Sequence, residues 1–74
     1  MKVTVFPDTE QDRVEALVEG ALGHRGGPRD LTLVVEQVEA GWRVHATGLG
    51  DAVLERGFAD VIEAALQRSD LQTG

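Results

Sequence analysis

The chain has 74 residues, of which 13 are acidic and seven are basic, and its net charge is −6 at neutral pH. A chain of this length forms one small domain that buries only about 60% of its unfolded surface. Proteins that bind nucleic acid neutralise phosphates with a basic surface. The acidic balance therefore argues against direct nucleic-acid binding.

The composition also limits the compartment. The chain has no cysteine, so it offers neither a disulfide nor a thiolate metal ligand. No apolar run approaches the roughly 20 residues that a membrane helix needs, and the run after Met1 is too short for a signal peptide. We expect a cytoplasmic protein that does not bind membranes. Because six of the seven basic residues are Arg, we interpret the gene as bacterial and GC-rich.

The first part of the chain predicts a strand and a helix. Residues 2–6 alternate and are rich in β-branched side chains, which is typical of a strand, and Pro7 ends it. Asp8 or Thr9 can cap the following helix, with Gln11 or Asp12 in capping-box position. The helix then carries apolar residues at helical spacing, namely Val14, Leu17, Val18, Ala21 and Leu22.

Residues 31–47 predict a hairpin whose register the sequence leaves open. The first strand, 31–38, is apolar on both faces, and the second, 42–47, alternates strictly. With a three-residue turn, Val38 lies opposite Trp42 and Val35 opposite His45. With a two-residue turn, Val38 lies opposite Arg43 and Glu36 opposite His45. The register decides which side chains share the open face, because a one-residue slip moves all the side chains of a strand to the opposite face of the sheet.

The last part predicts an amphipathic helix over residues 51–69, capped by Asp51. Its apolar face consists of Leu54, Phe58, Val61, Ile62, Ala65 and Leu66. Gly57 costs a helix roughly 1 kcal/mol relative to Ala, so an alternative remains in which 52–56 is a fourth strand and the helix begins near Phe58. Residues 70–74 are expected to form a frayed tail.

The predicted fold class is α+β, with residues 1–74 forming a single domain. The expected architecture is a two-layer sandwich of order β-α-β-β-α, or β-α-β-β-β-α, whose small, mainly antiparallel sheet is covered by two helices on one face. A right-handed crossover makes strands 2–6 and 31–38 parallel, and we expect strand 42–47 between them. This topology resembles a ferredoxin-like domain that lacks its last strand. Strand 2–6 would then be an open edge.

The open edge and the hairpin predict a surface for a protein partner. Its candidate residues are Lys2, Thr4, Phe6, Trp42, Arg43 and His45. If the edge pairs with a second chain, Thr4→Pro should break the association, because proline removes a backbone donor. We therefore expect a homodimer or a small interaction module that binds another protein.

Other chemistry finds little support in the sequence. His24, Arg25 and Arg29 surround a glycine-rich loop and form a candidate site for a small anion or metabolite. A metal site would need both histidines and a carboxylate to converge, and no pattern places them together. Candidate nucleophiles such as Ser69 lie near the chain ends. We expect no metal, no cofactor and no enzymatic activity.

One stretch resembles part of the HicB-type antitoxin domains. The matching residues are Gly41-Trp42, Gly48-Leu49-Gly50, Gly57 and Glu63-Ala64-Ala65-Leu66. The resemblance covers less than half of the chain, which lacks that family's Pro-Gly turn and its Thr-initiated helix. It implies a fourth strand and a small toxin as the protein partner.

Overall fold

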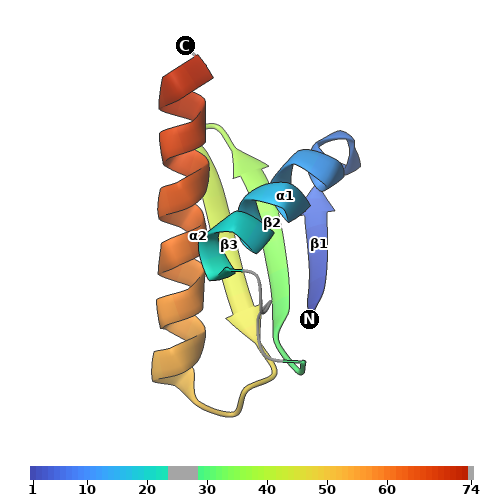
Figure 1. The fold of residues 1–74 in the computed structure, drawn as a ribbon, viewed down its shortest axis with the longest axis vertical. Coiled ribbons are helices and arrows are strands. Elements are labelled where there is room, and N and C mark those ends of the chain that lie inside the picture. Colours follow the sequence, from blue (N-terminus) through green and yellow to red (C-terminus); the bar gives the residue numbers. More distant parts are fainter. Residues whose placement is uncertain (24–28, 74) are drawn as a thin grey trace.

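The computed structural model describes residues 1–23 and 29–73 of the chain (Figure 1). It has the α+β fold that the sequence predicts, with a small sheet and two helices packed on it. The elements are β1 (Lys2–Phe6), a 3₁₀ turn (Asp8–Glu10), α1 (Gln11–Leu22), β2 (Thr32–Val38), β3 (Gly41–Thr47) and α2 (Ala52–Thr73).

The sheet is mixed, and its strand order corrects one expectation. The order is β1-β2-β3, with β1 parallel to β2 and β2 antiparallel to β3. The predicted parallel orientation of β1 and β2 is confirmed, whereas placing β3 between these two strands was wrong, since they pair directly. β2 is the central strand because it alone is apolar on both faces, which suits a strand with a neighbour on each side. Both β1 and β3 are edges of this sheet.

The hairpin has neither of the two predicted registers. Val38 pairs with Gly41 across the two-residue turn Glu39-Ala40. As a result Arg43 lies opposite Glu36, and His45 lies opposite Val34. Gly41 has a φ of 137°, a conformation that glycine adopts without a steric penalty. This glycine lets β3 begin immediately after the turn.

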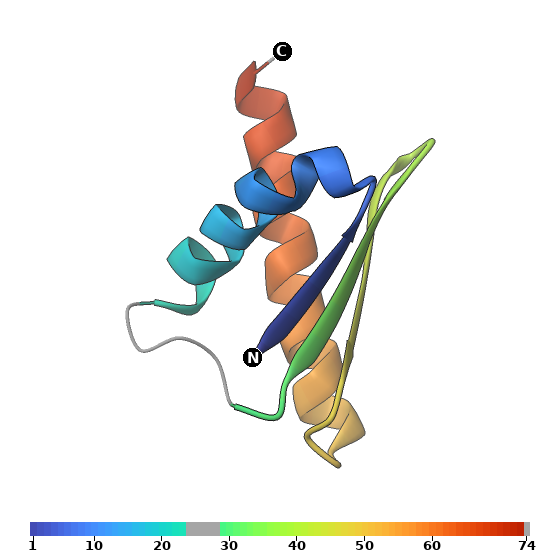
Figure 2. The same cartoon turned by 90° about the vertical axis from the view of Figure 1, so that its right-hand side faces the viewer.

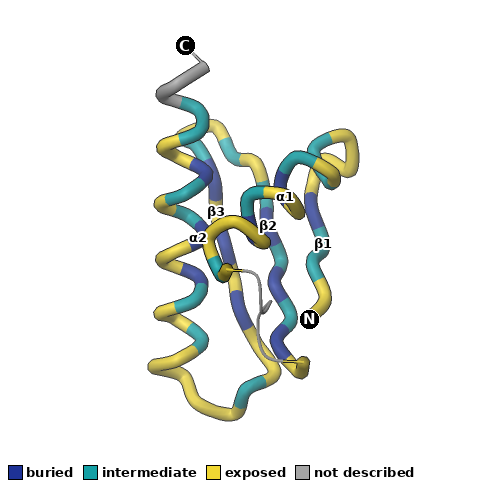
Figure 3. The backbone as a smooth tube through the Cα atoms, viewed as in Figure 1, coloured by how far each residue is buried: buried dark blue, intermediate teal, exposed yellow. Residues whose placement is uncertain are grey.

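Both helices cover the same face of the sheet, and the core lies between the two layers (Figure 2). Along β3 and most of β2, buried residues alternate with more exposed ones (Figure 3). Trp42 is only 4% exposed and belongs to this core. The buried residues are Val5, Val14, Val18, Leu31, Leu33, Val35, Trp42, Val44, Ala46, Ala59, Ile62 and Leu66.

The second helix follows the first of the two predictions for this segment. Asp51 Oδ1 accepts hydrogen bonds from the backbone N–H groups of Val53 at 3.0 Å and Leu54 at 3.3 Å. This N-cap starts α2 at Ala52, so residues 52–56 are helical and do not form a fourth strand. The helix continues through Gly57 and reaches Thr73, four residues beyond the predicted end.

The first helix begins differently from the prediction. Neither Asp8 nor Thr9 makes a side-chain cap; the chain instead passes through the 3₁₀ turn, and α1 starts without a capping side chain. Gln11 was predicted to take part in a capping box. Its side chain contacts the backbone of β1 instead.

Candidate interaction surfaces

The face of the sheet that the helices leave uncovered collects most of the predicted partner surface. Strand pairing places Lys2, Thr4 and Phe6 of β1 on the same face as Arg43 and His45 of β3. Phe6 is 53% exposed there. Trp42 lies on the opposite face, buried in the core, so it does not share this surface. The open sheet face is completed by Thr32, Val34, Glu36, Val38 and Thr47.

The outer edge of β1 is occupied by a side chain of the same molecule. Gln11 Oε1 accepts a hydrogen bond from the N–H of Val5 at 3.2 Å, and Gln11 Nε2 donates one to the carbonyl of Val3 at 2.9 Å. In a parallel ladder, one residue of a neighbouring strand makes this same pair of bonds, to residues i−1 and i+1. The Gln11 amide therefore takes the place of a parallel strand opposite Thr4. A further bond, from Nε2 to Glu15 at 2.6 Å, holds the amide on α1.

The backbone of Thr4 faces the interior of the sheet. Lys2 N–H donates to the carbonyl of Leu31 at 2.9 Å, on the β2 side. Backbone groups alternate in direction along a strand, so those of Thr4 also face β2 and those of Val3 and Val5 face outward. Thr4→Pro would therefore disrupt the β1–β2 ladder of the monomer, and that substitution does not test an outer-edge interface.

A second surface is apolar and lies where the end of α1 meets the first half of α2. Val53 is 80% exposed, Leu54 55% and Val61 48%. Leu54 and Val61 were predicted to lie on the buried face of this helix, and that prediction was wrong. The helix buries the narrower stripe Ala59, Ile62 and Leu66, because only that stripe meets the sheet. We call this region the helical apolar surface. It contains a hollow of about 420 Å³, and its residues are those that line the hollow, namely Ala21, Leu22, Val53, Leu54, Gly57, Phe58 and Val61.

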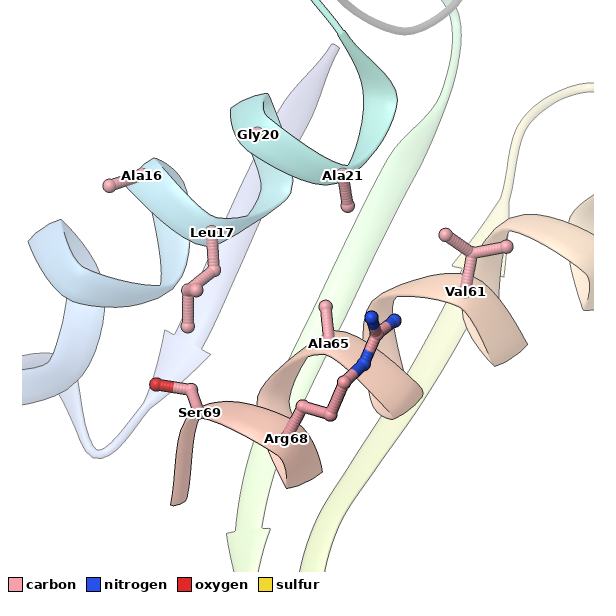
Figure 4. A pocket seen from close by; sticks show the side chains of 8 residues that line it. All are labelled: Ala16, Leu17, Gly20, Ala21, Val61, Ala65, Arg68 and Ser69. Carbon is pink, nitrogen blue, oxygen red and sulfur yellow. The ribbon is translucent and has the colours of Figure 1, made fainter. Parts of the chain in front are cut away.

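A groove between the two helices continues this surface (Figure 4). It has a volume of about 410 Å³ and shares Ala21 and Val61 with the helical apolar surface. Its walls are made mainly of small residues, with Ala21 of α1 and Ala65 of α2 extending into the space between the helices. Arg68 lies along the α2 side and is the charged residue in the lining.

A polar cluster joins α1, β3 and the end of α2. Asp70 accepts hydrogen bonds from Arg13 Nη2 at 2.5 Å and from the Trp42 indole N–H at 2.7 Å. Arg13 also pairs with Glu10 at 3.2 Å, and its guanidinium lies 5.9 Å from the centre of the Trp42 ring. The hydrogen bonds from Arg13 and then Trp42 lower the pKa of Asp70 below its ordinary value of 3.8. The charges are paired within the monomer, so we interpret the cluster as structural.

The remaining predicted sites find little support among the described residues. His24 and Arg25 of the candidate anion loop lie outside the described residues, and Arg29 is exposed. Among the residues that are described, no group of three or more His, Asp or Glu side chains is arranged to hold a metal ion. Over the same residues, neither helix combines the length and apolar content needed to cross a bilayer.

Comparison with known proteins does not place the chain in a family. No family model, curated protein or solved structure matches it at a significant level. The fold and its surfaces are therefore the grounds for the proposals that follow.

Proposed function

We propose that this protein is a small, non-catalytic interaction module of the cytoplasm that self-associates through the helical apolar surface. The observation that carries the proposal is the exposure of Val53, Leu54 and Val61 on one surface. Small monomers rarely leave contiguous apolar side chains in water unless they form a binding site. A domain of this size also gains stability from association, because its own core is small.

The absence of charge on this surface favours a second copy of the chain as its partner. Two copies that each carry −6 repel each other, so a self-contact is best placed where charge is absent. The seven residues lining the helical apolar surface are all uncharged. A two-fold contact requires a patch that is complementary to itself, and an apolar patch without charges meets that requirement.

The test is the mass of the protein in solution. Light scattering after size exclusion should give twice the monomer mass of 8.0 kDa, and Leu54→Glu should shift the protein to the monomer. Gln67→Glu is the matched control, because it adds the same charge at an exposed position of α2 outside this surface. Circular dichroism should show that both variants keep their helices.

Two results would contradict the proposal. One is a wild-type protein that remains monomeric at the highest concentration tested. The other is a dimer that Leu54→Glu leaves intact, which would move the interface to the open sheet face or to a sheet edge. The fourth strand that the resemblance to HicB-type antitoxins implied is absent from residues 52–56, which are helical.

A further inference from the structure

The outer edge of β3 has backbone groups that are free to pair. Leu31 faces β1 through its bond to Lys2, so by alternation Thr32, Val34, Glu36 and Val38 face β3. Their partners on β3 are Thr47, His45, Arg43 and Gly41. The backbone groups of Trp42, Val44 and Ala46 therefore face away from the sheet. Within the described residues, no hydrogen bond outside the β2–β3 ladder reaches these backbone groups.

This edge borders a groove whose other wall is α2. The groove has a volume of about 320 Å³, with Val44, His45 and Ala46 on the β3 side. On the α2 side, small residues at Ala52 and Ala59 leave space, and the lining also includes the charged residues Glu55, Arg56 and Asp60. A second hollow of about 540 Å³ lies farther along the same edge, where Gly41 and Trp42 meet Gln67 of α2.

Side-chain hydrogen bonds hold α2 beside β3 at both ends of this edge. At one end the Trp42 indole donates to Asp70 at 2.7 Å. At the other end the N–H of Leu49, just beyond β3, donates to Glu55 Oε2 at 3.0 Å. The helix and the strand are thus fixed relative to each other, and the space between them is pre-formed. Pre-formed sites avoid the entropy cost of ordering a flexible one.

We propose that the β3 edge binds one extended segment of a partner protein, which joins the sheet as a fourth strand beside β3, along the groove that α2 borders. Strand addition to an exposed sheet edge is an established mode of peptide recognition. The opposite edge is less suitable, because the Gln11 amide already bonds the Val5 N–H and the Val3 carbonyl, which face outward from β1. The proposal concerns a surface separate from the helical apolar surface, and it does not depend on self-association.

The occupant is a single strand and not a second copy of β3. Pairing two β3 edges about a two-fold axis would bring the two α2 helices to about one strand spacing, roughly 5 Å. Packed helices need about 8–10 Å, and α2 packs directly on β3 (Figure 2). A second whole domain is therefore excluded by its own helix, whereas an isolated extended segment carries no helix.

The flanking side chains define the chemistry of the segment. Alternate residues of an added strand would lie beside Arg43 and His45 on the open sheet face, where acidic or threonine side chains make favourable cross-strand pairs. The residues between them would face Val44, Ala46 and Ala59, where small apolar side chains fit. We therefore expect an extended segment in which acidic and small apolar residues alternate.

Selection from a library of random heptapeptides tests the proposal with the purified protein. Enriched peptides should show this alternation, and they should shift the amide resonances of Val44 and Ala46 more than those of Val3 and Val5. N-methylation of the peptide amides that face β3 should weaken binding by about tenfold or more, because each methyl removes a donor. N-methylation of the amides between them should be tolerated.

Charge reversal supplies a matched pair of variants. Arg43→Glu should weaken a selected acidic peptide by about fivefold. Lys2→Glu makes the same change in net charge on the far edge of the same face and should leave the affinity within about twofold of wild type. The proposal is overturned if no peptide is enriched. It is also overturned if enriched peptides shift β1 or α1 resonances in place of β3, or if alternate N-methylation has no effect.

Discussion

At the scale of single residues, a few side chains decide how the elements are held together. Asp70 links the end of α2 to α1 and β3 through one carboxylate. Gly48, where the chain leaves β3, allows the backbone to pass close to the backbone of Asp30. Its φ is +103°, and a Cβ at this position would lie 2.1 Å from the carbonyl oxygen of Asp30. Neither role could be predicted from the sequence, because both partners are distant along the chain.

The lowered pKa of Asp70 predicts a dependence of stability on pH. A carboxyl whose pKa is lower in the folded state than in the unfolded state stabilises the fold fully at pH values above its ordinary value of 3.8. The contribution is lost as the pH falls through the folded-state pKa. Asp70→Asn should therefore lower the urea midpoint at neutral pH, and the difference from wild type should shrink below pH 3.8.

Fluorescence of Trp42, the only tryptophan, can follow this unfolding. Asp60→Asn is the control, since Asp60 is exposed on the same helix. A constant difference between wild type and Asp70→Asn from neutral pH down to the acid transition would contradict the role of this carboxylate.

Substitution of Gly48 should be more damaging than substitution of a glycine that only turns the chain. Gly48→Ala forces a non-glycine residue into a positive φ, which costs about 1–2 kcal/mol, and it also creates a clash with backbone. We expect a loss of about 3 kcal/mol or more in the free energy of unfolding. Gly50→Ala shares the positive φ but meets nothing within 4 Å, so it should cost only about 1–2 kcal/mol. Urea unfolding measures both, and equal losses would mean that the close approach to Asp30 is relaxed easily.

At the scale of elements, the two edge strands differ in how their backbone is satisfied. Edge strands present unpaired groups that invite pairing with other chains, and proteins protect them in several ways. β1 is protected by an amide from α1, the helix that follows it directly. β3 has no such side chain at Val44 or Ala46 among the described residues and instead borders a groove. This difference directs strand addition to β3.

Removal of the Gln11 side chain should open the β1 edge. Gln11→Ala loses the bonds to Val5 N–H and Val3 C=O, which should lower the free energy of unfolding by about 1 kcal/mol. Hydrogen exchange at the Val5 amide should accelerate, and light scattering should show association that increases with concentration. Glu19→Ala is the control, because Glu19 is an exposed residue of the same helix. An unchanged exchange rate at Val5 would show that other groups protect this edge.

At the scale of the whole molecule, the three surfaces point in different directions. The helices cover one face of the sheet, so the open sheet face lies on the opposite side from the helical apolar surface (Figure 2). The β3 groove lies at the side, between the two layers. A dimer formed through the helices would therefore leave both β3 edges accessible. Self-association and strand addition can then be tested separately, with Leu54→Glu for one and Arg43→Glu for the other.

The sequence by itself determined the α+β class, three strands and two helices, and it offered Asp51 as one of two possible starts of α2. These follow from local periodicity, β-branched residues and capping, which act between neighbours in the chain. It also named Lys2, Thr4, Phe6, Arg43 and His45 as candidate partner residues, but only the strand pairing of the structure shows that these five share one face.

Only the tertiary structure decided the strand order, the hairpin register and the part of α2 that is buried. Each of these depends on contacts between distant segments. α2 carries more apolar residues than the sheet can cover, so packing selected Ile62 and Leu66 and left Leu54 and Val61 in solvent. Gln11 had two possible partners, the start of its own helix and the edge of β1. Its amide went to the edge because the parallel crossover brings that strand alongside α1, where Val5 and Val3 offer it both a donor and an acceptor.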